Sequence, residues 1–233
     1  MNDRFLHVKV VFEDNHLIAV CKPAGILVHS DETGDYTLAD WVKNYIKKRY
    51  NKPGDVFLGV IHRIDRPVSG VVLFARTSKA LTRMNEMMKE RKIEKTYYAL
   101  VYPRPEEFEG TLVHHIAKSE EKNKVKAFAS PKKDTKEAIL KYALQGELDG
   151  KVWLEVRPLT GRPHQIRAQL SKIGCPIIGD LKYGAGYPLS DQSIALHCVS
   201  MAFYHPVKQE QVVISCSPPR YFPWNTFDYP ENF

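Results

Sequence analysis

Short apolar runs separated by charged segments characterise the first third of the chain. Residues 58–61 and 71–75 form two such runs, and the segment between them is rich in charged side chains. A continuous apolar run of about four to eight residues is typical of a strand that is buried on both faces. We therefore predict two core strands that are joined by a charged turn at residues 62–70.

Similar runs recur along the chain, which contains no internal repeat and no low-complexity segment. Residues 151–157, for example, alternate apolar and mixed positions, as is typical of a strand with two different faces. The predicted strands cover residues 8–13, 17–21, 57–61, 71–75, 97–102, 137–144, 152–157, 194–199 and 211–216.

Two segments carry apolar residues at helical spacing. The first follows Thr37, which has the capping-box spacing with Asp40, and the second follows Ser78, a candidate N-cap. We interpret both apolar stripes as packing surfaces. Their members are Leu38, Trp41, Val42, Tyr45 and Ile46 in the first segment and Leu81, Met84, Met87 and Met88 in the second.

A third helix is predicted after residue 160. Thr160 or Gly161 would begin it, Pro163 suits its first turn, and Gly174 suits its C-terminal end. On a helical wheel Arg167 lies beside the apolar face, so its guanidinium group can reach the interior. A partly buried arginine needs a carboxylate or several hydrogen-bond acceptors.

The turn at 62–70 contains a carboxylate, Asp65, that must find a cation or hydrogen-bond donors if it lies near the core. His62, Arg63 and Arg66 are its neighbours in the sequence. Two interpretations follow: a structural ion pair that closes the turn, or a reactive carboxylate. Arg167 is a candidate partner for Asp65 in either case.

The chain is basic, with a net charge of +7 and a pI near 9.1. Basic residues concentrate at 76–104 and again in a lysine-rich stretch at 118–141. These stretches are either solvated faces or a surface that follows a nucleic-acid backbone, whose affinity would fall steeply with salt. The lysine-rich stretch contains Lys118, Lys122, Lys124, Lys126, Lys132, Lys133, Lys136 and Lys141.

The four cysteines are dispersed, and none belongs to a Cys-x-x-Cys pair or a zinc-like cluster. We expect them to be buried, reduced thiols. The N-terminal residues lack the features of a signal peptide, and no apolar run approaches the ~20 residues that cross a membrane. We therefore expect a cytoplasmic protein that does not bind membranes.

With 233 residues of which 43% are apolar, the chain can bury a substantial core. We expect one domain with two lobes, at about 1–102 and 137–216. Residues 103–136 would form a lysine-rich insertion, and 217–233 an aromatic, proline-rich tail. The aromatic rings of this tail could stack on bases or fold back over the core, and we favour the second use.

Several segments together resemble the RluA-type pseudouridine synthases, over most of the chain. Single short motifs recur by chance, but these occur in the family's order and at compatible intervals. They are Lys-Pro-Ala-Gly at 22–25, His-Arg-Ile-Asp at 62–65 with Ser-Gly at 69–70, Lys-Thr-Tyr-Tyr-Ala at 95–99, Thr-Gly-Arg at 160–162 with His-Gln-Ile-Arg at 164–167, Gly-Asp at 179–180 and Ala-Leu-His at 195–197.

The resemblance implies an α+β fold with a mixed, mainly antiparallel central sheet, flanked by helices and loops, and a central cleft. It also implies isomerisation of uridine in RNA, without metal or redox cofactor. The separate N-terminal RNA-binding domain of some members is expected to be absent, because the first motif begins at residue 22.

The resemblance also implies roles for individual residues. Asp65 matches the catalytic aspartate, Tyr97 the aromatic ring against the target uracil, and Arg167 the arginine that pairs with the aspartate. Val68 stands where the family usually has threonine, so a local hydrogen bond differs here. The residues expected to bind substrate are His62, Arg63, Lys95, Arg162, His164, Gln165 and Leu196.

Two other functions stay open at this stage. A noncatalytic RNA-binding module on the same fold would explain the charge but not the three catalytic-site matches. A hydrolase would need a second carboxylate with a raised pKa, and Asp180 is the candidate, although its Gly-Asp context suggests a structural turn. We expect a monomer that acts on rRNA or tRNA without an obligate protein partner.

Overall fold

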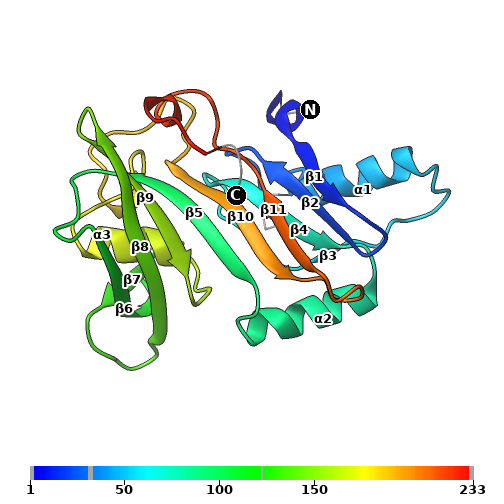
Figure 1. Ribbon diagram of the computed structural model, residues 1–233, viewed down its shortest axis with the longest axis horizontal. Coiled ribbons are helices and arrows are strands. Elements are labelled where there is room, and N and C mark those ends of the chain that lie inside the picture. Colours follow the sequence, from blue (N-terminus) through cyan, green and yellow to red (C-terminus); the bar gives the residue numbers. More distant parts are fainter. Residues whose placement is uncertain (1–2, 31–33, 122, 231–233) are drawn as a thin grey trace. The chain divides into compact units, whose positions relative to one another are not determined.

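The computed structural model describes residues 3–30, 34–121 and 123–230 (Figure 1). Its chain divides into two compact units. The first unit runs up to Ile93 and resumes at Ser200–Cys216, and the second comprises Glu94–Val199 and the described part of the tail. The predicted lobes at about 1–102 and 137–216 differ from these units in two places: residues 94–102 belong with the second unit, and residues 200–216 belong with the first.

The first unit is built on antiparallel strands in the order β1-β2-β4, with β3 also paired to β4. Every residue of β4 is buried, as predicted from its continuous apolar run. The strand predicted at 57–61 is shorter than expected. The strands are β1 (Lys9–Glu13), β2 (Leu17–Lys22), β3 (Gly59–Val60), β4 (Ser69–Ala75) and β11 (Gln211–Ser215), which pairs with the second half of β10 (Leu196–Tyr204).

Two α-helices belong to this unit, α1 (Leu38–Arg49) and α2 (Ser78–Lys89). The predicted capping box of α1 is confirmed, because Thr37 Oγ1 accepts from Asp40 N and the Asp40 carboxylate accepts from Thr37 N. The N-cap of α2 is Thr77, one residue before the predicted Ser78. Its apolar face packs against β3 and β4, which confirms its packing role (Figure 1).

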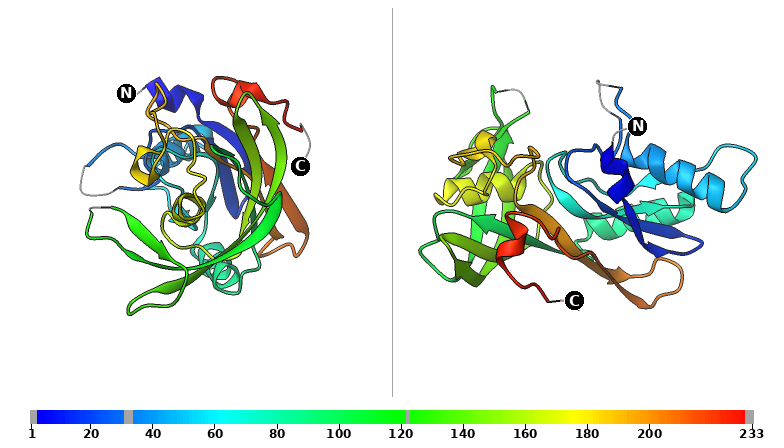
Figure 2. Two further views of the ribbon diagram at one scale, coloured as in Figure 1. Left: turned by 90° about the vertical axis from the view of Figure 1, so that its left-hand side faces the viewer. Right: turned by 90° about the horizontal axis from the view of Figure 1, so that it is seen from above.

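The second unit is an antiparallel sheet in the order β5-β9-β8-β6-β7. Helix α3 (Gln165–Lys172) packs against β6 and β7 (Figure 2). β6 and β7 were not predicted and lie in the segment that was expected to be an insertion. The strands are β5 (Glu94–Val101), β6 (Glu109–Lys118), β7 (Val125–Phe128), β8 (Lys136–Leu148) and β9 (Lys151–Pro158).

Helix α3 begins later than predicted. Its N-cap is His164, whose φ of 50° is left-handed, so Pro163 lies before the helix and not in its first turn. The Gln165 side chain occupies the preceding loop, where it accepts hydrogen bonds from Thr160 Oγ1 and Arg162 N. The predicted end is confirmed, since Gly174 follows the C-cap with a φ of +80°.

The described tail packs on the second unit. Trp224 is 2% exposed, and the ring of Tyr229 contacts those of Tyr98 and Trp153. This packing confirms the prediction that the tail folds over the core, although Phe233 lies outside the described residues, as does Lys122 of the lysine-rich stretch.

The prediction of four reduced cysteines is wrong in part. Cys21 on β2 and Cys216 after β11 form a disulfide, whereas Cys175 and Cys198 are free and buried. The two bonded Cα atoms lie 6.0 Å apart, within the range that a disulfide spans. Because 195 residues separate the two cysteines in the chain, local spacing in the sequence could not predict this disulfide.

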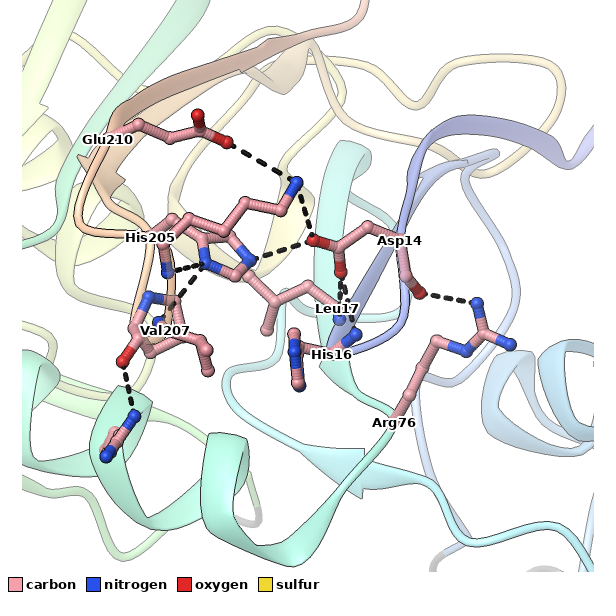
Figure 3. A network of polar contacts seen from close by, with 10 residues as sticks. Asp14, His16, Leu17, Arg76, His205, Val207 and Glu210 are labelled. Carbon is pink, nitrogen blue, oxygen red and sulfur yellow. Dashed lines mark hydrogen bonds and ion pairs between the residues drawn. The ribbon is translucent and has the colours of Figure 1, made fainter.

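A buried histidine ties two turns of the first unit together (Figure 3). His205 Nδ1 accepts from the backbone N–H groups of Val207 and Lys208, and Nε2 lies 2.9 Å from Asp14 Oδ2. Burial raises the pKa of Asp14, but the N–H groups of His16 and Leu17 help to bring it below its ordinary value. The network fixes the β1–β2 turn against the β10–β11 turn.

Both units combine antiparallel strands with helices, which confirms the predicted α+β class. Among the described residues, no helix is both long enough and apolar enough to span a bilayer.

Candidate active site

The turn that carries Asp65 is fixed by its backbone. Val68 N donates to Asp65 O at 3.0 Å, and Gly25 N donates to Arg66 O at 2.7 Å. Gly25 has a φ of +89°, a backbone conformation that favours glycine, and the Arg4 guanidinium group occupies the space where a Cβ atom would project. The hydrogen bonds hold the Asp65 backbone in one position while its side chain stays only half-buried.

Lys22 is the buried cation behind this turn. Its side chain is fully buried, and Nζ donates to the carbonyl oxygens of Pro23, Ile26 and Arg66. Burial lowers the pKa of Lys22 to about 7, against the opposing effect of the Asp65 carboxylate. The turn therefore rests on a lysine whose charge the Asp65 carboxylate favours.

Val68 stands where the family that this sequence resembles usually has threonine. Its side chain is 2% exposed and belongs to the core of the first unit, where a methyl group needs no hydrogen-bond partner. The backbone turn from Asp65 to Val68 forms without a hydroxyl group at this position.

His62 and Arg63, two predicted substrate-binding residues, flank the same turn. His62 Nε2 accepts from Leu73 N at 3.0 Å, which ties the histidine to β4. Arg63 is exposed, and its Nη1 lies 3.5 Å from His29 Nε2. Thus His62 is anchored, while the Arg63 guanidinium lies at the surface where a phosphate can reach it.

In the second unit, Arg167 on α3 forms a bidentate ion pair with Asp180. Nε donates to Oδ2 at 2.7 Å and Nη2 to Oδ1 at 2.8 Å, and the two side chains are 6% and 1% exposed. The sequence analysis considered Asp180 as the second carboxylate of a hydrolase or as part of a structural turn, and not as the partner of Arg167. Gly179 permits this turn, because its φ is +86° and a Cβ atom would lie 2.8 Å from Ser193 O.

Tyr183 organises the surroundings of this ion pair. The Arg167 guanidinium lies over its ring at 4.9 Å, and its hydroxyl accepts from Val125 N and lies 2.9 Å from His164 Nδ1. His164, a predicted substrate-binding residue, is thus tied to Tyr183 through its ring and has a left-handed backbone conformation. Such a conformation in a non-glycine residue is uncommon and is often found at functional sites.

Tyr97 and Lys95 lie two residues apart on β5. Tyr97 is 8% exposed and pairs with Val156 of β9. Burial lowers the pKa of Lys95, against the opposing effect of Cys198. The Lys95 ammonium group lies beside Gly161.

Gln165, Arg162 and Leu196 complete the predicted set. Gln165 Nε2 donates to Ile139 O, and Arg162 Nε donates to Glu137 O, so both residues are tied to β8. Leu196 begins β10 and is 4% exposed. Gln165 and Leu196 are therefore buried parts of the second unit.

The predicted site residues thus fall into two groups. His62, Arg63 and Asp65 belong to the first unit, and the other seven to the second. The pairing of Asp65 with Arg167 joins the two groups and stays a prediction. Reasoning from the sequence gave no role to Lys22 or Tyr183 and considered Asp180 only as the second carboxylate of a hydrolase. Lys22 and Asp180 both lie in segments that carry the family resemblance, at 22–25 and 179–180.

Comparison with known proteins gives this arrangement a family context. The family model described as RNA pseudouridylate synthase matches residues 16–172. A tRNA pseudouridine synthase C of Vibrio parahaemolyticus is 31% identical over 230 residues, which cover 91% of this chain and 91% of that protein. A ribosomal large subunit pseudouridine synthase C of Buchnera aphidicola is 30% identical over 214 residues, or 88% of this chain.

This chain spans 65% of the length of the Buchnera protein. Among solved structures, human RNA pseudouridylate synthase domain containing 4 superposes with a TM-score of 0.76 at 22% identity, over 91% of this chain and 89% of that one. Human RNA pseudouridylate synthase domain containing 1 gives 0.72, also at 22% identity, over 94% and 86% of the two chains. These similarities confirm the predicted family and its fold.

Proposed function

Because the chain belongs to the RNA pseudouridylate synthase family, we propose that it isomerises uridines in structured RNA to pseudouridine, with Asp65 as the catalytic carboxylate. The observation that supports this assignment best is the Asp65 turn itself. Its backbone carbonyls accept hydrogen bonds from Val68 N, Gly25 N and Lys22 Nζ, while the carboxylate stays half-buried. A reactive group needs this combination of fixed position and access.

The reaction exchanges one bond for another. The bond from N1 of uracil to C1′ breaks, the ring turns, and C5 bonds to C1′, so N1 gains a proton and C5 loses one. A carboxylate can serve as nucleophile or as base. Asp65 could attack C1′ or remove the proton at C2′, and both routes give the same product.

We assign the remaining roles by the same reasoning. Arg167, oriented by Asp180 and Tyr183, would pair with Asp65 and favour its ionised form. The Tyr97 ring would lie against the uracil. A target nucleotide must leave its stack to reach such a site, at a cost of a few kcal/mol, which phosphate contacts from Arg63 and the lysine-rich stretch would offset.

The names of the relatives indicate only the class of RNA that could be the substrate. Their names specify transfer RNA or the large ribosomal subunit, and we propose one or both for this chain. We also propose that it acts in the cytoplasm as a monomer without an obligate partner. Gel filtration with light scattering tests the monomer, for which the mass would be 26.7 kDa.

The test uses RNA from cells that lack this protein. Purified protein is added to total RNA, and pseudouridines are mapped before and after. The proposal expects new pseudouridines at defined sites in rRNA or tRNA. Release of free uracil would instead indicate a hydrolase, and binding without conversion would indicate a noncatalytic module.

A further inference from the structure

A cavity of about 420 Å³ opens beside the Asp65 turn, and none of the roles above uses it. All of its lining residues belong to the first unit. Its volume is within the range of sites that hold small organic ligands, about 300–1,000 Å³. The lining residues are Phe5, Gly25, Ile26, Leu27, Asp35, Tyr36, Asn44 and Arg66.

The cavity has an aromatic and apolar wall. Phe5 and Ile26 are 4% and 3% exposed, and Tyr36, which is 39% exposed, meets the Phe5 ring edge to face at 5.0 Å. Asn44 Nδ2 donates to the Tyr36 hydroxyl at 2.7 Å, which fixes the orientation of the Tyr36 ring. A planar ligand can therefore stack on an oriented ring.

The same cavity contains an acceptor next to a donor. Asp35 Oδ2 lies 3.0 Å from Arg66 Nη2, and Arg66 Nε donates to Gly25 O. Both side chains of the ion pair stay about half exposed, at 45% and 49%. An ionised carboxylate only accepts hydrogen bonds and a guanidinium only donates them, so a matching ligand must present donors beside an acceptor.

Positive charge surrounds the Gly25 end of the cavity. The Arg4 guanidinium lies where a Gly25 side chain would project, and Arg66 donates to the Gly25 carbonyl. Two arginines at one backbone position suit a phosphate group. A nucleotide needs a ring on which its base can stack, polar groups for the edge of the base, and a cation for its phosphate, and the cavity offers all three.

We propose that this cavity binds a second nucleotide of the RNA substrate, next to the target uridine, and that it selects guanine. The location follows from Arg66, which lines the cavity and directly follows Asp65, so that their Cα atoms are about 3.8 Å apart. Guanine presents two adjacent N–H donors, at N1 and N2, to the Asp35 carboxylate, and its O6 acceptor to Arg66. Uracil and adenine lack two adjacent donors there.

The guanine pocket rests on the proposed function, and the experiment below can reject either the pocket or the isomerase activity without rejecting the other. A substrate RNA is randomised at two positions on each side of the target uridine, and the wild-type protein is presented with this pool. Molecules that are bound and molecules that are converted are sequenced separately. The ratio of guanine to each other base is expected to rise about fivefold or more at one flanking position, since a good bidentate base contact discriminates about 5- to 150-fold.

Three variants identify the source of the enrichment. Asp35→Asn should abolish the guanine preference, and Tyr36→Ala should lower binding of the guanine-containing RNA about 5- to 100-fold, as is usual for a lost base-stacking ring. Asp55→Asn, an exposed residue of the same unit that does not line the cavity, is the control and should retain the preference.

Each outcome decides between the claims. Guanine enrichment among bound but unconverted RNA, lost in Asp35→Asn, would support the pocket and reject the proposed activity. Conversion without any flanking preference, or with a preference that survives both Asp35→Asn and Tyr36→Ala, would overturn the pocket and leave the activity standing. No enrichment in either fraction would also overturn the pocket.

Discussion

Replacing Asp180 by asparagine should destabilise the second unit strongly. The substitution keeps the shape of the side chain but removes the charge that faces Arg167 Nε and Nη2 at 2.7 and 2.8 Å. Removing one partner of a buried ion pair costs about 3–5 kcal/mol, because the remaining charge stays out of water. We expect Asp180→Asn to lower the free energy of unfolding by this amount.

The matched control is an exposed ion pair of the same unit. Arg157 Nη2 lies 2.8 Å from Glu155 Oε1, but the two side chains are 62% and 24% exposed, so water reaches both charges. Exposed pairs contribute about 0–1 kcal/mol, since water and salt screen them. Arg157→Gln should therefore change the free energy of unfolding by less than 1 kcal/mol, although the distance between charges is the same.

Urea unfolding followed by tryptophan fluorescence measures both variants. Two of the three tryptophans, Trp153 and Trp224, belong to the second unit and report on the region that is changed, whereas Trp41 belongs to the first unit. With a urea m-value of about 2 kcal/mol per molar, the midpoint for Asp180→Asn should fall by about 1.5–2.5 M. A loss no larger than that of Arg157→Gln would refute the assignment of a buried, energetically coupled pair.

A double variant separates stability from catalysis. Arg167→Met with Asp180→Leu replaces the pair by apolar side chains, which is often neutral or stabilising. We expect the double variant to be more stable than Asp180→Asn and yet inactive, because the role proposed for Arg167 requires its guanidinium group. Activity in the double variant would contradict the proposed role of Arg167.

Three further predictions concern the rest of the molecule. The pKa of Lys22 is lowered to about 7 in the folded state, so the unfolded chain binds more protons than the folded chain between pH 7 and about 10.4, and this group makes the free energy of unfolding rise with pH in that window. Lys22→Met should flatten this rise when the free energy of unfolding is measured with urea at several pH values. The same pH dependence in Lys22→Met and wild type would contradict the assignment. Thiol titration of the unfolded chain should find two thiols without reductant and four with it, and four without reductant would exclude the Cys21–Cys216 disulfide. Replacing Lys132 and Lys133 by glutamate should weaken RNA binding and reduce the slope of log affinity against log salt by about two, and an unchanged slope would remove this stretch from the interface.

Local patterns in the sequence predicted most of the secondary structure. The capping box at Thr37 and Asp40 and the apolar run of β4 each depend on neighbouring residues, and both were confirmed. β6 was missed because alternate residues along it are solvent-facing and charged residues surround it, so its apolar face was too sparse to recognise. The burial that defines this strand comes from β8 and α3, which lie far away in the sequence.

The features of the site that the sequence did not predict depend on contacts between residues that are not neighbours in the chain. Arg167 was correctly expected to need a carboxylate, but nothing local distinguished Asp180 as a partner thirteen residues along the chain. The beginning of α3 was misplaced because Pro163 suits a first turn, whereas the side chain of Gln165 bonds to Thr160 and the loop continues to His164. In each case a tertiary contact overrode a local preference.

The most direct test of the central claim measures whether the Asp65 carboxylate is required for isomerisation. RNA that carries tritium at C5 of uridine releases it to water when C5 bonds to C1′. The wild-type protein should release tritium in proportion to the pseudouridine formed, and Asp65→Asn, which keeps the size of the side chain, should bind the RNA but release none. Release by Asp65→Asn at a rate near that of the wild type would contradict the account.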